Sequence, residues 1–128
     1  EDGSQTRDFV FIDDVTKINF NSVVSNDLLN EIFNIGTGEK TNVLSLYKTI
    51  SRELGKKNNF EITMKHRLGD IRHNFADVKK IKKIIKKFNT VNINQGIGKF
   101  IKWFESQDVP SSLFQKSMNE LIEKDLYK

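Results

Sequence analysis

The sequence predicts an α/β fold whose second half is largely helical, and three observations support this prediction. Short runs of β-prone apolar residues alternate with segments of helical period as far as Lys65. Beyond that point the apolar patterns are mainly helical. The chain has 128 residues, of which 37 % are hydrophobic, which suits one domain that buries roughly two-thirds of its unfolded surface. The predicted strands are few for an independent α/β domain, so we expect the chain to be part of a larger architecture.

Three segments are predicted to form strands. Phe9–Ile12 is a short apolar run typical of a buried strand. Glu31–Ile35 is the second candidate, and the loosely alternating segment Phe60–Lys65 is the third. The second candidate ends in Gly36-Thr37-Gly38, a turn that tolerates positive φ. The polar stretch from His66 to Asn74 is predicted to be a loop.

Two helices are predicted in the first half of the chain. Asp13 and Asp14 can cap a helix that begins near Val15. Thr41 or Asn42 can cap a second helix, and Gly55 suits the end of that helix.

Three further helices are predicted after residue 76. Asp77 can cap the first, and the second carries its apolar face from Ile97 to Phe104 and ends before Pro110. Ser112-x-x-Gln115 has the pattern of a capping box for a last helix, which is expected to end near Leu126.

The positive charge of the chain is local. The formal net charge is +4, yet six lysines and no acid lie between Lys79 and Lys87, so the remainder of the chain is net negative. Apolar residues at helical spacing accompany the lysines: Val78, Ile81, Ile84, Ile85 and Phe88. This pattern indicates an amphipathic helix with a solvated lysine face, and the alternative is a face that binds an anionic polymer or a membrane surface.

Several classes of function are excluded by composition. The chain has no cysteine, which excludes thiol chemistry and cysteine-based zinc sites. His66 and His73 are the only histidines, and they are too few and too loosely spaced for a metal site. No apolar run approaches the ~20 residues of a membrane span, and no stretch of these 128 residues has the pattern of a signal peptide. We therefore expect a cytoplasmic protein without a membrane or nucleic-acid partner.

Two polar segments have the composition of a nucleoside diphosphate site. The first delivers Arg7 just before an apolar run, and the second, residues 67–74, holds two arginines, an acid and a glycine. The arginine fork fits phosphate oxygens in two-point contact, and a carboxylate can accept from the two hydroxyls of a ribose. Surface ion pairs are the alternative interpretation. Gly36-Thr37-Gly38 is favoured as a plain turn over a dinucleotide loop, because the third glycine position holds Thr41.

Four segments in order resemble extended short-chain dehydrogenases/reductases that act on nucleotide sugars. Residues 2–14 are similar to the family segment D-G-x-x-x-R-D-[FY]-[VI]-[YHF]-[VI]-x-D, and residues 33–43 to [FY]-N-[IVL]-G-x-G-x-x-[TY]-[ST]-[VIL]. Residues 67–77 resemble R-x-G-D-[VI]-R-H-x-x-A-D, and residues 96–104 resemble G-[IL]-x-x-x-[IVT]-x-W-[FY]. The form of the third segment is most similar to 4-epimerases of UDP-hexoses and UDP-N-acetylhexosamines.

This resemblance implies roles for four residues. Arg7 and Arg67 are expected to hold the diphosphate of a UDP-sugar, Asp70 to meet the ribose, and Asn74 to lie where the family adjusts space for the 2-substituent of the sugar. Family members oxidise C4 of the sugar with NAD and return hydride to the other face, which requires a glycine-rich NAD loop and a Tyr-x-x-x-Lys pair. The 128 residues contain neither motif, so no catalytic or NAD-binding residue is expected here.

The resemblance therefore points to the C-terminal substrate-binding portion of such an enzyme, with the last elements of its Rossmann sheet. Residues 1–107 carry that portion, and 108–128 form a C-terminal helical extension. The NAD-binding N-terminal portion is the expected partner, and these residues alone are expected to be inactive. Exposed strand edges favour self-association.

Two other functions remain open at this point. The first is a stand-alone basic module that binds an anionic polymer or membrane through the lysines of residues 79–87. The second, within the family, is a nucleotide-sugar dehydratase or reductase. The sequence leaves open the sugar, its N-acetylation, the base and the oligomeric state.

Overall fold

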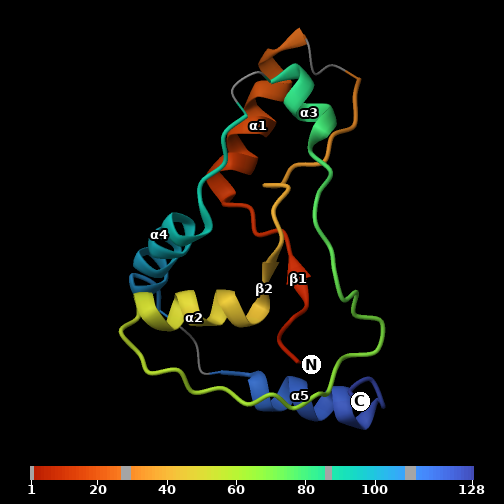
Figure 1. The fold of residues 1–128 in the computed structure, drawn as a ribbon, viewed down its shortest axis with the longest axis vertical. Coiled ribbons are helices and arrows are strands. Elements are labelled where there is room, and N and C mark those ends of the chain that lie inside the picture. The colour runs from red at the N-terminus through yellow and green to blue at the C-terminus, as the bar shows by residue number, and fades with distance from the viewer. Residues whose placement is uncertain (1, 27–29, 86–87, 109–111) are drawn as a thin grey trace.

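The computed structural model describes residues 2–26, 30–85, 88–108 and 112–128. It is rich in helix, with one small sheet of two strands within these ranges (Figure 1). The elements in chain order are β1 (Thr6–Arg7), α1 (Ile12–Val24), β2 (Thr41–Asn42), α2 (Val43–Glu53), α3 (Lys79–Ile84), α4 (Ile93–Glu105) and α5 (Phe114–Glu123).

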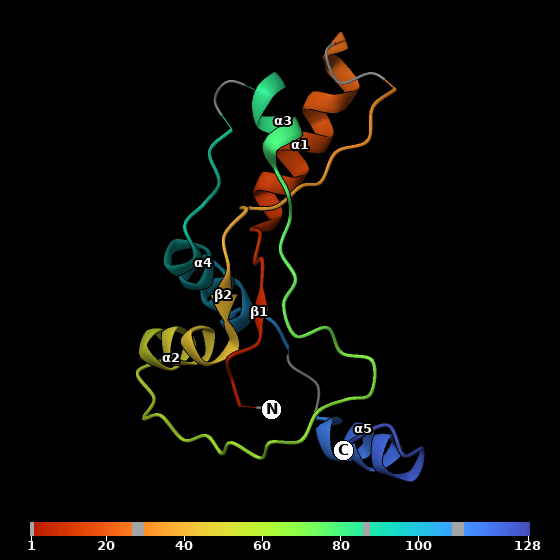
Figure 2. The ribbon, with the colours of Figure 1, turned by 45° about the vertical axis from the view of Figure 1, so that its right-hand side comes forward.

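The small sheet lies between two groups of helices. α1 and α3 lie side by side at one end, and α2 packs against α4 next to the sheet (Figures 1 and 2). α5 lies at the opposite end, where the long irregular segment between α2 and α3 passes it. The sheet therefore occupies the position where segments from both ends of the molecule meet.

Three extended segments run together at the sheet. β1 pairs with β2 in antiparallel register, Thr6 opposite Asn42 and Arg7 opposite Thr41. On the other side of β1, Thr6 forms a parallel bridge with His73. There the Thr6 N–H donates to the Arg72 carbonyl at 3.0 Å, and the Asn74 N–H donates to the Thr6 carbonyl at 3.1 Å. Residues 72–74 thus continue the sheet beyond β1, which fixes that part of the loop.

The buried core lies between α1 and α3. Ile18 of α1 contacts Val78 and Ile81, and Ile81 is fully buried. The partly buried residues packed against them are Phe33, Ile35, Ala76, Ile85 and Phe88. This confirms the predicted apolar face of the lysine-rich segment. The buried carboxylate of Asp14 accepts a hydrogen bond from the Val91 N–H at 2.7 Å, so α1 also holds the segment that leads into α4.

The three predicted strands are wrong within the described residues. Ile12 opens α1 instead of ending a strand, while Phe9–Phe11, Glu31–Ile35 and Phe60–Lys65 are irregular. A strand needs a neighbour that completes its ladder of hydrogen bonds, and no described segment takes that place along these runs. The paired segments are instead β1, which lies just before the predicted Phe9–Ile12 strand, and β2, which holds the predicted helix caps Thr41 and Asn42.

The predicted helices form, but the ends of α1 and α3 differ from those predicted. α1 begins at Ile12 rather than Val15, so Asp13 and Asp14 lie in its first turn and neither caps it. α3 ends at Ile84, and Lys86 and Lys87 lie outside the described residues. Asp77 accepts from the Lys79 N–H at 2.9 Å, although Val78 is the capping position.

α5 begins without the predicted capping box. Ser112 Oγ accepts from the Phe114 N–H at 3.2 Å, but Gln115 bonds Asn119 rather than reaching back toward Ser112. The helix ends at Glu123 instead of near Leu126. Pro110, the predicted end of the preceding helix, lies outside the described residues.

The predicted ends of α2 are confirmed. The Asn42 side chain accepts from the Ser45 N–H at 2.6 Å and caps the helix, while Gly55 follows it with φ of 62°. Across the described ranges, no helix has the length and apolar character needed to cross a bilayer.

We predict that Gly38→Ala destabilises the fold more than Gly55→Ala. Both glycines have positive φ, which costs an alanine about 1 kcal/mol. A Cβ at Gly38 would also lie 2.8 Å from Val78 Cγ2. At Gly55, apart from the adjoining residues of the chain, no described atom lies within 4 Å of the corresponding Cβ position. That overlap adds roughly 1–3 kcal/mol. Urea denaturation of the two variants measures the difference, and equal losses would contradict this account of the Gly38 turn.

Candidate functional site

An open cavity of about 570 Å³ lies beside β1. It is lined by the end of β1, by the segment before the Gly36 turn and by the segment that follows His73: Arg7, Asp8, Phe33, Asn34, Ile35, Asn74, Phe75 and Ala76. Two of the predicted site residues, Arg7 and Asn74, are therefore brought together. They are far apart in the sequence, and they meet because residues 72–74 pair with β1.

The guanidinium of Arg7 is held by backbone carbonyls. Nη1 donates to the Thr6 carbonyl at 2.9 Å and to the Arg72 carbonyl at 3.2 Å. Both bonds use the same nitrogen, so Nη2 and Nε have no hydrogen-bond partner within the described ranges. Because two neutral acceptors orient the group without neutralising it, Arg7 keeps its charge and spare donors for an anion.

The neighbouring carboxylate of Asp8 connects three segments. Oδ1 accepts from the Thr37 N–H at 2.9 Å and from the Thr37 hydroxyl, while Oδ2 accepts from the Gly38 N–H at 2.9 Å and from the Ala76 N–H at 3.2 Å. Partial burial acts to raise the pKa of Asp8, but these four hydrogen bonds outweigh it and hold the pKa below its ordinary value. Asp8 therefore stays ionised and fixes the Gly36 turn against the cavity.

Position 36 must be glycine because Asp8 and Ala76 both approach its backbone closely. A Cβ there would lie 2.6 Å from Asp8 Oδ2 and 2.6 Å from the Ala76 Cβ. No side chain other than hydrogen fits between the Asp8 carboxylate and Ala76.

The other two predicted residues lie elsewhere. Arg67 pairs in an antiparallel bridge with Tyr127, and Gly69 turns the chain with φ of 89°. Asp70 lines a separate shallow hollow with Asp2, Met64, His66 and Arg72. The structure therefore does not bring Arg67 or Asp70 to the cavity that Arg7 and Asn74 line.

Arg72 connects the cavity beside Arg7 with the hollow that Asp70 lines. Its carbonyl accepts from Arg7 Nη1, and its side chain donates to the carboxylate of Asp2 and, at 2.7 Å, to the hydroxyl of Ser4. The Ser4 backbone N–H, the Arg72 guanidinium and the Ser4 hydroxyl together lower the pKa of Asp2. Arg72 is thus occupied by an intramolecular ion pair, while Arg7 is not.

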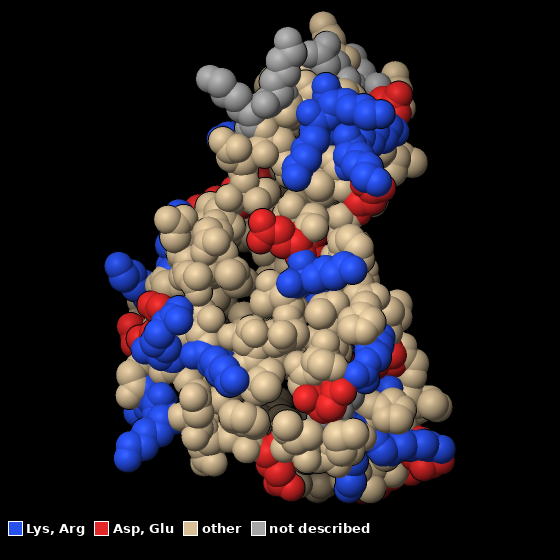
Figure 3. Space-filling model, in the orientation of Figure 1, with Lys and Arg blue, Asp and Glu red and all other residues tan. Residues whose placement is uncertain are grey.

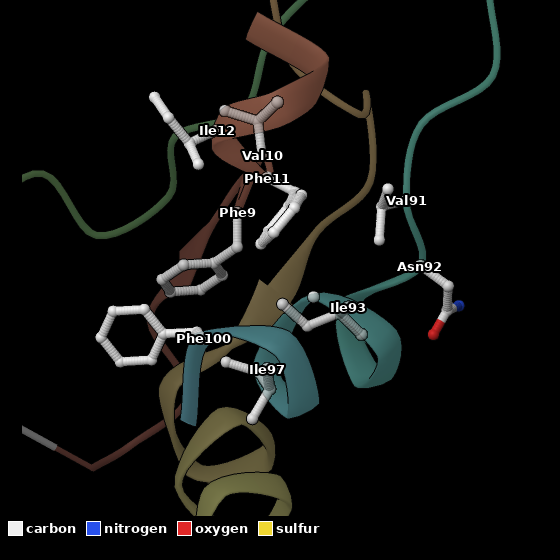
Figure 4. A pocket seen from close by; sticks show the side chains of 10 residues that line it. Phe9, Val10, Phe11, Ile12, Val91, Asn92, Ile93, Ile97 and Phe100 are labelled. Atoms are coloured by element: carbon white, nitrogen blue, oxygen red, sulfur yellow. The ribbon is translucent and has the colours of Figure 1, made fainter. Parts of the chain in front are cut away.

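A second, apolar groove of about 240 Å³ lies between α4 and the segment before α1. Figure 4 shows side chains converging on it from both elements, among them Phe9, Phe11, Ile97 and Phe100. Phe9–Ile12, predicted as a strand, thus contributes one wall of an open apolar surface. Phe100 and Trp103 of α4 remain about half exposed, at 48 % and 56 %.

Sequence reasoning missed Asp8 and Thr37. In the sequence, an acid before an apolar run cannot be distinguished from an ordinary surface charge. Thr37 cannot be distinguished from an ordinary turn residue. Their bond joins positions 29 residues apart, so no local spacing signals it. Within the described ranges, no cluster of three or more histidine or acidic side chains is placed to hold a metal ion.

Comparison with known proteins gives a consistent result, although no family model matches the chain. A putative UDP-glucose 4-epimerase of Methanocaldococcus jannaschii is 35 % identical over 107 residues, which are 84 % of this chain and 33 % of that protein. The UDP-N-acetylglucosamine 4-epimerase of Methanobrevibacter ruminantium M1, solved with UDP-N-acetylmuramic acid, superimposes with a TM-score of 0.67 at 31 % identity, over 84 % of this chain and 34 % of that one.

Over most of its length the chain is similar to extended short-chain dehydrogenases/reductases, in the branch of nucleotide-sugar epimerases and dehydratases. A further solved structure, the UDP-glucuronic acid 4-epimerase of Bacillus cereus, contains UDP-glucuronic acid and NAD. It matches with a TM-score of 0.64 at 27 % identity, over 80 % of this chain and 34 % of that one. These matches confirm the resemblance and the fold class predicted from the four segments. The chain spans about a third of the length of these relatives.

We predict that Asp8→Asn lowers the free energy of unfolding by about 2 kcal/mol at neutral pH, because an amide cannot accept all four hydrogen bonds. The folded-state pKa of Asp8 lies below its ordinary value of 3.8. The stabilisation is therefore complete above that value and is lost as the pH falls through the folded-state pKa. Urea denaturation across this range should show the difference from wild type shrinking in acid.

Asp13→Asn is the matched control, since Asp13 is an exposed acid in the first turn of α1. Its effect should be smaller at neutral pH. A loss in Asp8→Asn that stays constant from neutral to strongly acid pH would contradict the role assigned to the Asp8 carboxylate.

Proposed function

We propose that this chain supplies the nucleotide-sugar-binding portion of an NAD-dependent UDP-sugar 4-epimerase. The observation that carries the proposal is the Arg7 guanidinium, oriented by two carbonyls at the cavity that Asn74 also lines. Several relatives and structural neighbours over most of the chain are 4-epimerases of UDP-sugars, which supports the substrate class.

In this proposal Arg7 and Arg67 bind the diphosphate, Asp70 accepts from the ribose, and Asn74 faces the 2-substituent of the sugar. An arginine fork held by carbonyls loses little conformational freedom when it binds phosphate, so its hydrogen bonds contribute most of their strength. Arg67 and Asp70 share one turn, in which the Asp70 N–H donates to the Arg67 carbonyl at 3.2 Å. That turn offers a cation and a carboxylate three residues apart in the sequence.

In this proposal the described residues do not supply the NAD site. The Gly36-Thr37-Gly38 turn has the composition of a phosphate loop, but the N–H groups of Thr37 and Gly38 already donate to the Asp8 carboxylate. A pyrophosphate there would meet a negative charge instead of free donors. The Tyr-x-x-x-Lys pair is also absent from the sequence, so NAD and the hydride step belong to the rest of the protein, and we expect the 128 residues alone to be inactive.

The apolar groove supports the proposal that the NAD-binding portion is a separate part of the protein that contacts this chain. Phe9, Phe11 and Phe100 line a groove with little polar surface, and exposed apolar patches of this kind mark contact surfaces. Since the chain spans a third of its relatives, we propose that the remaining protein, with its NAD-binding portion, covers the groove. Without that cover the chain should self-associate.

A different function has one observation in its favour. The exposed lysines of α3, Lys79, Lys80, Lys82 and Lys83, form the basic patch at the upper right of Figure 3. Such a patch can attract an anionic polymer or a membrane surface. Lys80 is nevertheless paired with Glu31 at 2.7 Å, which reduces the free charge. A dehydratase or reductase of the same family would be told apart from an epimerase by its product.

We predict that Arg7→Ala and Arg67→Ala each weaken the binding of UDP to the full-length protein on the order of 10- to 100-fold, because each removes a charge-assisted contact to phosphate. Isothermal titration calorimetry with UDP measures the loss. Arg52→Ala is the control, since Arg52 lies on α2 and donates to Asn94 of α4 at 3.1 Å.

Reversing the charge of Lys79 and Lys83 separates this proposal from a basic module. UDP affinity should stay within about twofold of wild type, because both lysines are exposed on α3 and neither lines the cavity of Arg7, and salt screens exposed charges. Loss of UDP binding in the lysine variants, with Arg7→Ala unaffected, would contradict the proposed site.

A further inference from the structure

The segment Leu126–Lys128 runs antiparallel to residues 66–68 and bonds to them through the backbone. The Lys128 N–H donates to the His66 carbonyl at 2.9 Å, the Leu68 N–H donates to the Leu126 carbonyl at 2.9 Å, and the His66 N–H donates to the Lys128 carbonyl. Arg67 and Tyr127 face each other in the centre of this pairing. We call residues 126–128 the tail strand.

The end of α5 is built to direct the chain into this pairing. Asp125 follows the helix in the left-handed conformation, with φ of 53°. The Leu126 N–H donates to the Leu121 carbonyl at 2.9 Å and the Asp125 N–H to the Ile122 carbonyl at 3.0 Å, which is the Schellman pattern of helix termination. The reversal at Asp125 therefore sets the direction of the tail strand.

Tyr127 anchors the other side of the tail strand. It is half-buried and lines a cavity of about 240 Å³ with Gln5, Leu44 and Tyr47. Gln5 lies just before β1, which carries Arg7. The tail strand thus pairs with the segment that carries Arg67 and shares a cavity with the segment that leads to Arg7.

Packing of α5 does not account for this arrangement, because α5 has no buried residue. The segment that holds Arg67 also needs support. From Gly55 to Asp77 the chain forms no helix and no extended ladder, and the Arg67 side chain is exposed. An irregular segment pays conformational entropy when it binds a ligand unless it is ordered beforehand.

We propose that the tail strand positions Arg67 for the diphosphate of the nucleotide sugar. Arg67 does not line the cavity beside Arg7, so in this proposal the diphosphate spans from that cavity to the Arg67 turn. The backbone bonds of the tail strand order residues 66–68 in the free protein, so that less entropy is lost when UDP binds. Residues 126–128 are positioning residues that act through Arg67 and do not touch the reacting atoms. This inference rests on the proposed function, because it assumes that Arg67 binds phosphate.

The first test compares Lys128→Pro with Lys128→Ala in the full-length protein. Both remove the lysine side chain, but only proline removes the N–H that donates to His66. We expect Lys128→Pro to bind UDP about tenfold more weakly than Lys128→Ala, the size expected for losing one ordering contact of ~1.4 kcal/mol. With UDP-glucose as substrate, KM should rise and kcat should stay within about twofold of wild type.

The second test is a double-mutant cycle. If the tail strand acts through Arg67, Lys128→Pro should reduce UDP affinity only slightly in an Arg67→Ala background. In an Arg7→Ala background it should reduce UDP affinity as much as it does in the wild type. An equal loss of UDP affinity in the wild-type, Arg67→Ala and Arg7→Ala backgrounds would overturn the proposal, because it would show a general structural effect. A chain truncated after Lys124 serves as a second variant, and failure of both variants to fold would assign the tail strand to folding and overturn its positioning role.

The two proposals can fail separately. Absence of UDP binding in the wild-type full-length protein would overturn the proposed function and this inference with it. UDP binding that depends on Arg67 but is the same in Lys128→Pro and Lys128→Ala would overturn this inference alone.

Discussion

The carboxylate of Asp8 is the constraint on which the rest of the structure depends. It follows Arg7 directly, and it accepts hydrogen bonds from Thr37, Gly38 and Ala76, which belong to two segments far from it in the sequence. One ionised group therefore fixes the end of β1, the Gly36 turn and the approach to α3. Because four donors converge on it, the group is more strongly held than a surface ion pair, which contributes roughly 0–1 kcal/mol.

The position of Arg7 follows from that constraint. With Asp8 fixed on one side and the Thr6 and Arg72 carbonyls bonded to Nη1, the guanidinium has little freedom. The same carboxylate occupies the N–H groups of the Gly36 turn and so removes them as a phosphate site. Asp8 thereby leaves the Arg7 guanidinium available for an anion and makes Gly36–Gly38 a structural turn. The sequence alone allows a phosphate-binding role for both segments.

The helices could be predicted from the sequence because their signals are local. Asn42 caps α2, and Val78 and Ile81 repeat at helical spacing. The strands could not, because an apolar run such as Phe9–Ile12 specifies burial but not the partner that would pair with it. For the site, Arg7 and Asn74 were predicted and do share a cavity, whereas the bonds of Asp8 and the pairing of Arg67 with Tyr127 join residues 29 to 68 positions apart and leave no local pattern. The resemblance ends near residue 107, so it gave no indication of the tail strand.

The most direct test of the account is a crystal structure of the full-length protein with UDP. The account predicts that the diphosphate lies in the cavity beside β1, with its oxygens within hydrogen-bond distance of the Arg7 guanidinium. It also predicts that Arg67 reaches the same diphosphate while the tail strand remains paired with residues 66–68. A nucleotide bound at the lysines of α3, or one that leaves Arg7 without contact, would contradict the account.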